Sequence, residues 1–267
     1  MKAKKKLLLA LCIVVVLTAT VAGSVLGTIA YLTSSAAVSN VFTVGNVQIV
    51  MDEGRVNSEG KIVNPTDRVD TNTYHLVPGK QYDKDPQIRV NSGSEDSYLF
   101  VLVRNDLETI GPKGDTQYMT IAEQMYYLGW KKFAEAATGD VYIYCGERSG
   151  NGTTVLPVNT EDDQALKGWL DTHRGNLEDF NGNAALTQAG STYNLFKYFY
   201  TDPTNTDLST YGAAKITLTA VAIQATGFGN GDGSEASVEA AWEAVLKAYP
   251  YIHTNTNTTT STPDSNS

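Results

Sequence analysis

KITLTAVAIQAT, residues Lys215–Thr226, is the longest strand-like run of this chain and is rich in β-branched residues. β-Branched and aromatic side chains are favoured in β-strands. A second run, YLFVLV at Tyr98–Val103, is apolar at successive positions, so both faces of such a strand would be apolar. That pattern is typical of a strand in the middle of a sandwich. The two runs predict a β-sheet core that is covered on both faces.

Shorter strand patterns lie between turn signals. Val47, Ile49 and Met51 recur at every second position and would share one face of a strand. Two more strands are predicted over Val141–Cys145 and over Tyr193–Tyr200, YNLFKYFY. Pro-Gly, Asn-Gly and Asp-Pro pairs separate these runs. We therefore expect an all-β fold, an antiparallel jelly-roll β-sandwich.

Helical patterns are fewer. Thr120–Ala136 has apolar residues at roughly helical spacing, although Gly129 weakens the pattern. Glu161–Leu177 begins with acidic residues, which suit a helix N-terminus, and we expect it to be an inserted helical segment. Ser234–Tyr249 is the clearest helix, because a serine can cap its start, one apolar stripe follows and Pro250 ends it.

The first 30 residues have the layout of a secretory signal peptide. Four lysines within Met1–Lys6 precede the apolar segment Leu7–Ala22, and small residues follow. The apolar run is shorter than the roughly 20 residues that span a bilayer, so cleavage is favoured over a retained membrane anchor. The spacing of small residues permits cleavage after Ala22 or after Ala30, which would leave Tyr31 as the first residue.

Composition limits the partners of the exported chain. The full chain has 20 Lys+Arg, 29 Asp+Glu and a net charge of −9, and loss of the four leader lysines would make the charge −13. An exported chain this acidic should repel nucleic acid and remain soluble. Only Cys145 would remain after removal of Cys12 with the leader, so no internal disulfide is possible and a structural thiol is expected. Residues 254–267 are polar and of low complexity, which predicts a disordered tail.

Three stretches carry a resemblance to a known family. GTIAYLTSSAAVSNVFTVGNVQI, Gly27–Ile49, resembles the leader-to-first-strand junction of the TasA/camelysin family, secreted proteins of Gram-positive bacteria that a SipW-type signal peptidase cleaves. Leu76–Val103 is similar to that family's Pro-Gly turn, Val-x-Asn-x-Gly turn and central strand. Ala220–Trp242 is similar to its last strand and closing helix. Residues 105–210 do not match closely and are expected to be an insertion.

The resemblance implies a jelly-roll fold and a biofilm-matrix or cell-surface role. In the fibres that some members form, the N-terminal segment of one subunit fills a gap in the sheet of the next. The resemblance also favours cleavage between Ala30 and Tyr31. The corresponding segment here, Tyr31–Val44, has no charge and no proline, so it can add to an exposed sheet edge. The alternative is that it forms the first strand of its own sandwich. The expected donor-strand residues are Leu32, Val38, Val41, Phe42 and Val44.

An enzymatic role has little support in the residues. A zinc peptidase commonly has two histidines one helical turn apart with a nearby glutamate, but His75, His173 and His253 are widely separated and no HExxH motif is present. A serine hydrolase would need a Gly-x-Ser-x-Gly elbow, which is also missing. Calcium is a weaker alternative, with oxygen ligands in Asn230–Glu235 and Asp52-Glu53, although Gly-Asp-Gly is common in turns. We therefore predict no catalytic residue, no metal site and no cofactor.

The sequence as a whole predicts a signal peptide at residues 1–30, a TasA-like domain at 31–253 and a polar tail at 254–267. The expected function is that of a secreted structural subunit, extracellular or at the cell surface. Its expected partners are other copies of itself, the SipW-type signal peptidase and other matrix or surface components, with membrane contact only through the uncleaved signal peptide. The alternatives are a monomeric cell-surface binding module or adhesin and, third, a camelysin-like metallopeptidase.

Overall fold

The computed structural model of the chain describes residues 33–36, 38–113, 118–136, 139–146, 183–249 and 252, with side chains from Val41 onward. The predicted signal peptide, the predicted helix at Glu161–Leu177 and the predicted polar tail lie outside these residues. Strands dominate the described part, as predicted, and two α-helices accompany them. No helix within the described ranges is long and apolar enough to cross a membrane.

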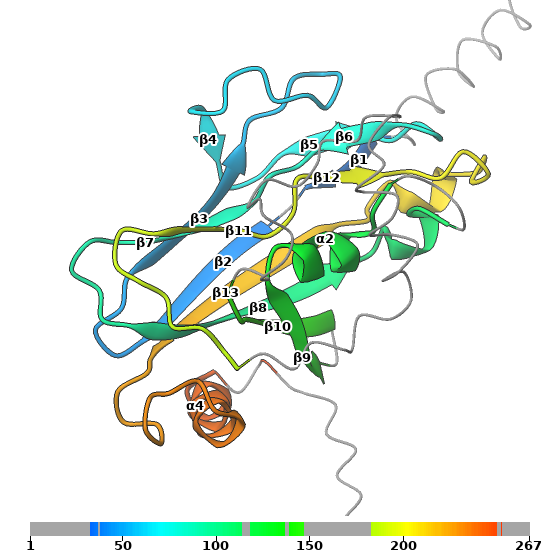
Figure 1. The fold of residues 1–267 in the computed structure, drawn as a ribbon. Helices are drawn as coiled ribbons and strands as arrows, with labels where there is room; N and C mark the ends of the chain where they lie inside the picture. Colours follow the sequence, from blue (N-terminus) through cyan, green and yellow to red (C-terminus); the bar gives the residue numbers. More distant parts are fainter. Residues whose placement is uncertain are drawn as a thin grey trace, which may run out of the picture.

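The largest sheet has five strands in the order β2-β13-β8-β10-β9 (Figure 1). β13 pairs antiparallel with β8 but parallel with β2, so the sheet is mixed and not entirely antiparallel as the sequence predicted. Both long runs found in the sequence lie in its middle, one in β13 and the other in β8. The strands are β2 (Val38–Val44), β8 (Ser97–Asn105), β9 (Trp130–Ala136), β10 (Gly139–Tyr144) and β13 (Ile216–Gln224).

A four-stranded sheet, in the order β11-β7-β3-β4, faces the first one. Val47, Ile49 and Met51 all point into the core between the sheets, as their alternation predicted. Two short pairs, β1-β5 and β12-β6, complete the strand set. The strands are β1 (Thr33–Ala36), β3 (Ile49–Gly54), β4 (Arg68–Val69), β5 (Thr73–His75), β6 (Gln81–Asp83), β7 (Gln87–Val90), β11 (Thr192–Asn194) and β12 (Tyr198–Tyr200).

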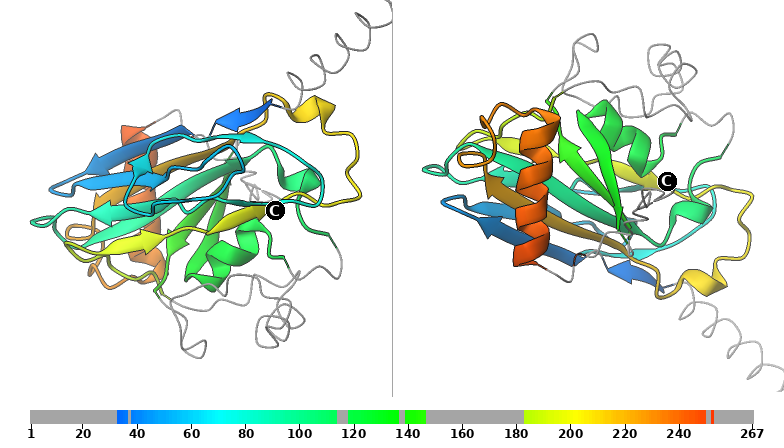
Figure 2. Two further views of the ribbon diagram at one scale, coloured as in Figure 1. Left: turned by 90° about the horizontal axis from the view of Figure 1, so that it is seen from above. Right: turned by 90° about the horizontal axis from the view of Figure 1, so that it is seen from below.

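Helix α4 (Glu235–Ala248) lies across the outer face of the five-stranded sheet (Figure 2). Its apolar stripe packs on the alternate side chains of β8 and β13 that face away from the inner core, such as Phe100 and Val221. Trp242 is 6% exposed, and its ring centroid lies 4.9 Å from that of Phe100. The molecule therefore has three layers, and the five-stranded sheet is the middle one.

Two sequence predictions within residues 105–210 are wrong in detail. The predicted helix at Thr120–Ala136 ends early: α2 spans Ile121–Tyr127, and β9 begins at Trp130. Gly129 adopts φ 91° between them, a conformation that interrupts an α-helix. The predicted strand Tyr193–Tyr200 is two strands, β11 and β12, because β11 pairs with β7 and β12 pairs with β6.

The region expected to be an insertion is therefore not peripheral to the sheets. It supplies β9, β10, β11 and β12, of which β10 pairs directly with the central strand β8. Cys145 follows β10 and is half-buried against the α4 side of the sheet. Two short 3₁₀ helices, Glu108–Ile110 and Ser209–Tyr211, complete the described elements.

The packing of α4 yields the first prediction. Truncation of the large buried ring in Trp242→Ala should lower the free energy of unfolding by ~3–5 kcal/mol, because it leaves a cavity between α4 and the sheet. Urea denaturation followed by circular dichroism measures this. The exposed residue Glu239 on the same helix provides the control, and Glu239→Ala should change stability by less than ~0.5 kcal/mol. Equal effects of the two changes would contradict the packing described.

Candidate functional site

The N-terminal strand β2 lies along one edge of the middle sheet (Figure 1). Its residues pair in parallel register with β13, from Val38 beside Thr217 to Val44 beside Ile223. On its other side β2 has no strand partner among the described residues. Within this chain, residues Val38–Val44 of the expected donor segment therefore form the edge strand of the five-stranded sheet.

Side chains of β2 contribute to both faces of the sheet. Val41 packs against the core between the two sheets, whereas Phe42 and Val44 pack against the cluster under α4. All three are half-buried. β2 is uncharged, and its contribution to stability is apolar contact plus the backbone ladder with β13.

The residue after α4 holds β2 from outside the sheet. The ring of Tyr249 packs on that of Phe42 with centroids 4.8 Å apart. Its hydroxyl donates a hydrogen bond of 2.8 Å to the backbone oxygen of Thr43. The C-terminal helix and the N-terminal strand are therefore coupled directly, although 206 positions separate Tyr249 from Thr43.

Two exposed residues separate β2 from the buried chain that follows. Gly45 and Asn46 are exposed, whereas Val47, the next residue, is buried in the core. Gly45 has φ 86°, and a side chain there would collide with Gln224, whose Oε1 accepts from the Asn46 backbone N–H. The segment up to Val44 is thus separated from the buried remainder of the chain by two exposed residues.

The predicted site residues fall into three groups. Ala30, Tyr31 and Leu32 lie outside the described residues. Val38 lies at the start of β2, where its backbone pairs with Thr217. Phe42 and Val44 come together with Tyr249 in the cluster under α4, a contact that the sequence pattern did not predict, whereas Val41 faces the core between the two sheets. No local pattern could have made that connection, because it depends on where α4 ends.

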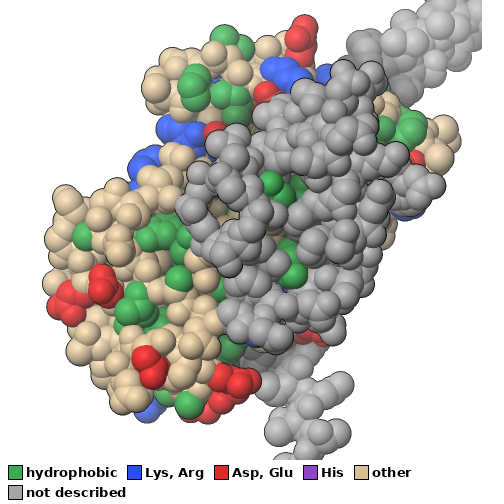
Figure 3. All heavy atoms as spheres, viewed as in Figure 1, with side chains coloured by type: hydrophobic (Ala, Val, Ile, Leu, Met, Phe, Trp, Pro, Cys, Tyr) green, Lys and Arg blue, Asp and Glu red, His purple; other side chains and the backbone are tan. Residues whose placement is uncertain are grey.

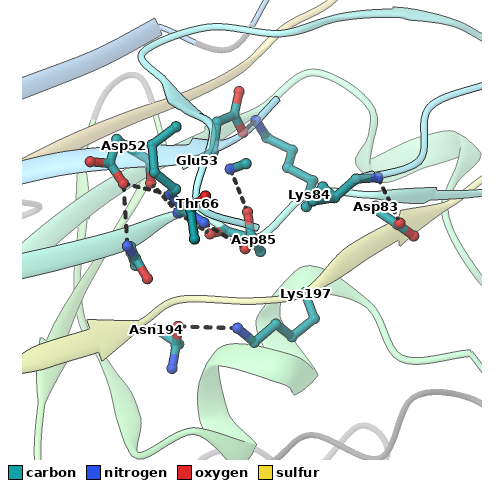
Figure 4. Close-up of polar contacts among 12 residues, drawn as sticks. Asp52, Glu53, Thr66, Asp83, Lys84, Asp85, Asn194 and Lys197 are labelled. Carbon is teal, nitrogen blue, oxygen red and sulfur yellow. Dashed lines mark hydrogen bonds and ion pairs between the residues drawn. The ribbon is translucent and has the colours of Figure 1, made fainter. Parts of the chain in front are cut away.

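A second feature is a cluster of charged side chains at the end of β3 (Figure 4). Asp52 accepts hydrogen bonds from Arg68 Nε at 2.8 Å and from Arg89. Arg68 Nη1 also reaches Asp85 at 2.8 Å. Burial alone would raise the pKa of Asp52, but its hydrogen bonds to Arg89 and Arg68 outweigh burial and hold the pKa below the ordinary value of 3.8.

Glu53 and Lys84 form a fully buried pair in the same region, and Figure 4 shows their side chains pointing toward one another. Both side chains are 1% exposed. The second oxygen of Glu53 accepts the backbone N–H of Asn72 at 3.0 Å. Aromatic rings of Tyr74, Tyr82 and Phe199 pack against one another beside them, with Lys84 Nζ 5.8 Å from the ring centroid of Tyr74.

The residues weighed for metal or catalysis are dispersed. His75 is exposed on β5, and His173 and His253 lie outside the described residues. Asp52 and Glu53, which were considered for calcium, form ion pairs with arginine and lysine. In the second candidate loop, Asp232 Oδ1 accepts hydrogen bonds from Ser234 N and Ser237 Oγ at the start of α4. Over the ranges that the structure describes, no three His, Cys, Asp or Glu side chains gather as a metal site would require.

Comparisons with known proteins add no relative. No protein-family model matches the chain, and searches of curated proteins and of solved structures return no match.

The Tyr249 contact yields a prediction about β2. Removal of the hydroxyl in Tyr249→Phe should weaken the hold on β2 by ~1 kcal/mol, because the bond to the Thr43 oxygen is lost while the ring packing remains. Hydrogen exchange at the β2 amides should become faster. Tyr211→Phe, which removes a hydroxyl that bonds Thr109 elsewhere, is the matched control and should leave β2 exchange unchanged. Unchanged exchange in both variants would contradict the role of Tyr249.

The Asp52 cluster yields a prediction about pH. Because the pKa of Asp52 is lowered by folding, its contribution to stability is present above the unfolded value of 3.8 and is lost as pH falls through the lower folded value. Asp52→Asn should cost ~3 kcal/mol at neutral pH, since Arg89 loses its charge partner and Arg68 keeps only Asp85. The difference from wild type should shrink in acid. Denaturant unfolding at neutral and acidic pH measures it, and a constant difference would contradict the assignment.

Proposed function

We propose that this chain is the secreted subunit of an extracellular fibre, and that copies join when β2 of one occupies the place beside β13 in another. The proposal includes export through the predicted signal peptide, SipW-type cleavage between Ala30 and Tyr31 and a location in the matrix or at the cell surface. It also includes the jelly-roll arrangement of the two sheets that the family resemblance implies.

The observation that carries the proposal is the orientation of β2. Among the described strand pairs, β2 with β13 is the parallel one, and β13-β8-β10-β9 without β2 is entirely antiparallel. β2 is also at the sheet edge and next to the described N-terminal end of the chain. It can thus leave or enter its place without disturbing any other pair in that sheet, and β1, which precedes it and pairs with β5, would move with it.

The exchange would conserve the contacts of the strand. An identical β2 from a second copy would make the same ladder with β13 and the same contacts with Tyr249. Exchange of an identical element between copies is a low-cost route to assembly. The exposed residues Gly45 and Asn46 supply the place where the chain can redirect. A head-to-tail exchange that does not close extends into a fibre, whereas reciprocal exchange gives a closed dimer.

Charge on the surface does not by itself select an arrangement of copies. On the face shown in Figure 3, Asp and Glu side chains are seen at the end that holds α4, whereas the end near β4 shows Lys and Arg together with acidic side chains. Cations in that region are paired within the chain, as Arg55 is with Asp67 and Lys61 is with Asp83.

A second candidate function, a monomeric surface-binding module, is favoured by one cavity. It has a volume of about 510 Å³ and lies between the end of β8, the start of α2 and β10. Asp106, Glu108, Asp140 and Tyr142 contribute to its lining. A binding module would use this cavity in the same way with or without residues 31–44.

The proposal predicts assembly that depends on residues 31–44. Purified chain beginning at Tyr31 should form filaments in negative-stain micrographs, and a chain beginning at Gly45 should not, because it lacks the strand that links copies. A synthetic peptide of residues 31–44 should bind the truncated chain and raise its thermal midpoint, since it restores the β13 ladder. The same peptide with Phe42→Asp is the control and should bind more weakly.

Three results would contradict the proposal. They are monodisperse monomer from the chain that begins at Tyr31, closed dimer without filaments, and filaments of unchanged yield from the truncated chain. Val50→Ala, a change at a 40% exposed position of β3 outside the segment, should leave filament yield unaltered.

A further inference from the structure

The cavity of about 510 Å³ between the end of β8, the start of α2 and β10 is lined in part by buried apolar side chains. Ile110, Met119 and Phe199 belong to this lining, and each is at most 5% exposed. Small-molecule sites are commonly cavities of roughly 300–1,000 Å³ in which a few polar groups lie among apolar ones. The polar groups of this cavity therefore decide which class of ligand fits it.

Tyr142 on β10 supplies a buried hydroxyl to the cavity. Its side chain belongs to the lining, and the residue is 6% exposed. Among the described residues, no group forms a hydrogen bond with this hydroxyl. Buried polar groups are usually hydrogen-bonded, and a hydroxyl removed from water without a partner costs free energy. In a cavity, such a hydroxyl takes its partner from whatever enters, water or ligand.

Carboxylates make the cavity negative around that hydroxyl. Glu108 and Asp140 both line the cavity. Burial raises the pKa of the Tyr142 hydroxyl, and the negative charges of Asp140 and Glu108 raise it further. The hydroxyl therefore stays neutral at physiological pH, and its oxygen can accept a hydrogen bond from a donor that the two charges attract.

The cations near this cavity do not balance its acids. Arg104 is the one basic residue of the lining within the described ranges, and its Nε donates to the Asp106 carboxylate at 2.9 Å. Asp140 pairs with Lys132 at 3.0 Å, which leaves Glu108 without an ion pair in the described part of the chain. A cationic ligand would gain attraction from this unmatched charge, and an anionic ligand would be repelled.

We propose that this cavity binds a primary ammonium group carried on an apolar stem. The stem would lie against the apolar lining, and the ammonium would donate to the Tyr142 hydroxyl oxygen in the field of Glu108 and Asp140. A lysine side chain of another protein has this chemistry, and so has a free alkyl amine. A neutral alcohol or sugar could donate to the same oxygen, but it would gain nothing from the unmatched charge.

The site goes beyond the proposed fibre function and does not depend on it, because the cavity lies within one copy. It also gives a ligand class to the binding-module alternative. Failure of an amine to bind would leave filament formation untouched, so the two proposals can fail separately.

Saturation-transfer NMR with the purified full chain tests the proposal. The probe is n-pentylamine, and 1-pentanol, a neutral molecule of the same length, is its matched control. At pH 7 the amine should bind at least about tenfold more tightly than the alcohol, because hydrogen bonds of charged groups are the stronger ones. Equal affinities, tighter binding of the alcohol, or no transfer to the amine would overturn the proposal.

Three variants place the amine in this cavity. Glu108→Gln, a change at an exposed position, should weaken amine binding by about threefold and leave the affinity for 1-pentanol unchanged. Tyr142→Phe should weaken amine binding by about fivefold. Glu239→Gln, which neutralises an acid beside α4 in a different cavity, is the matched control and should change nothing. Equal losses in Glu108→Gln and Glu239→Gln, or wild-type affinity in Tyr142→Phe, would overturn the assignment.

Two further probes distinguish the sources of the ammonium. Nα-acetyl-lysine N-methylamide presents the group as a protein side chain does, and pentane-1,5-diamine presents it as a free amine. Tighter binding of the lysine derivative would assign the cavity to a protein partner, and tighter binding of the diamine would assign it to a soluble amine. Both results support the site. Equal binding of the same lysine derivative after acetylation of its Nε would overturn it, because that change removes the charge.

Discussion

Strand β13 is the element on which the rest of the structure depends. Its backbone is shared between β8 on one side and β2 on the other, and alternate side chains enter different cores. Leu218 and Ala220 face the opposing sheet, whereas Val221 and Ile223 lie under α4. Because both faces and both edges of β13 are occupied, the position of the N-terminal strand and that of the C-terminal helix are determined together.

The charged cluster at the end of β3 places ionic side chains, in addition to apolar ones, in the interior. β3 begins with the apolar pattern of Ile49 and Met51 and ends with Asp52 and Glu53, both buried. Each carboxylate is matched by a cation from another segment, so the acids that give the chain its negative charge are in part internal. Such matching requires a single register of β3 against β7, since a slip by one residue would move every charge to the other face.

Local patterns were sufficient for the strands and for α4, but not for how they pair. Alternation predicted β3, a continuous apolar run predicted β8 and a run of β-branched residues predicted β13. An apolar stripe that ends before Pro250 predicted α4, although the Ser234 side chain at its start makes no capping hydrogen bond. The split of YNLFKYFY was not visible, because it arises where the backbone of Lys197 donates to Gln124 Oε1 of α2. Nor could the sequence show β2 beside β13, or Glu53 beside Lys84, since both contacts depend on register between distant segments. For the candidate site, the sequence was sufficient to predict the segment Tyr31–Val44, but not the place beside β13 where β2 lies.

The parallel alignment of β2 with β13 has a mechanical consequence. Seven residue pairs join the two strands, all in one register. Tension between the chain before β2 and the chain after β13 would act along the strand axis. The hydrogen bonds of the ladder would then bear the load together in shear, and would not be broken one after another. Tyr249 adds a clamp at the far end of the strand. Whether the ladder lies within one copy or between two, this joint is of the type that resists stretching better than peeling.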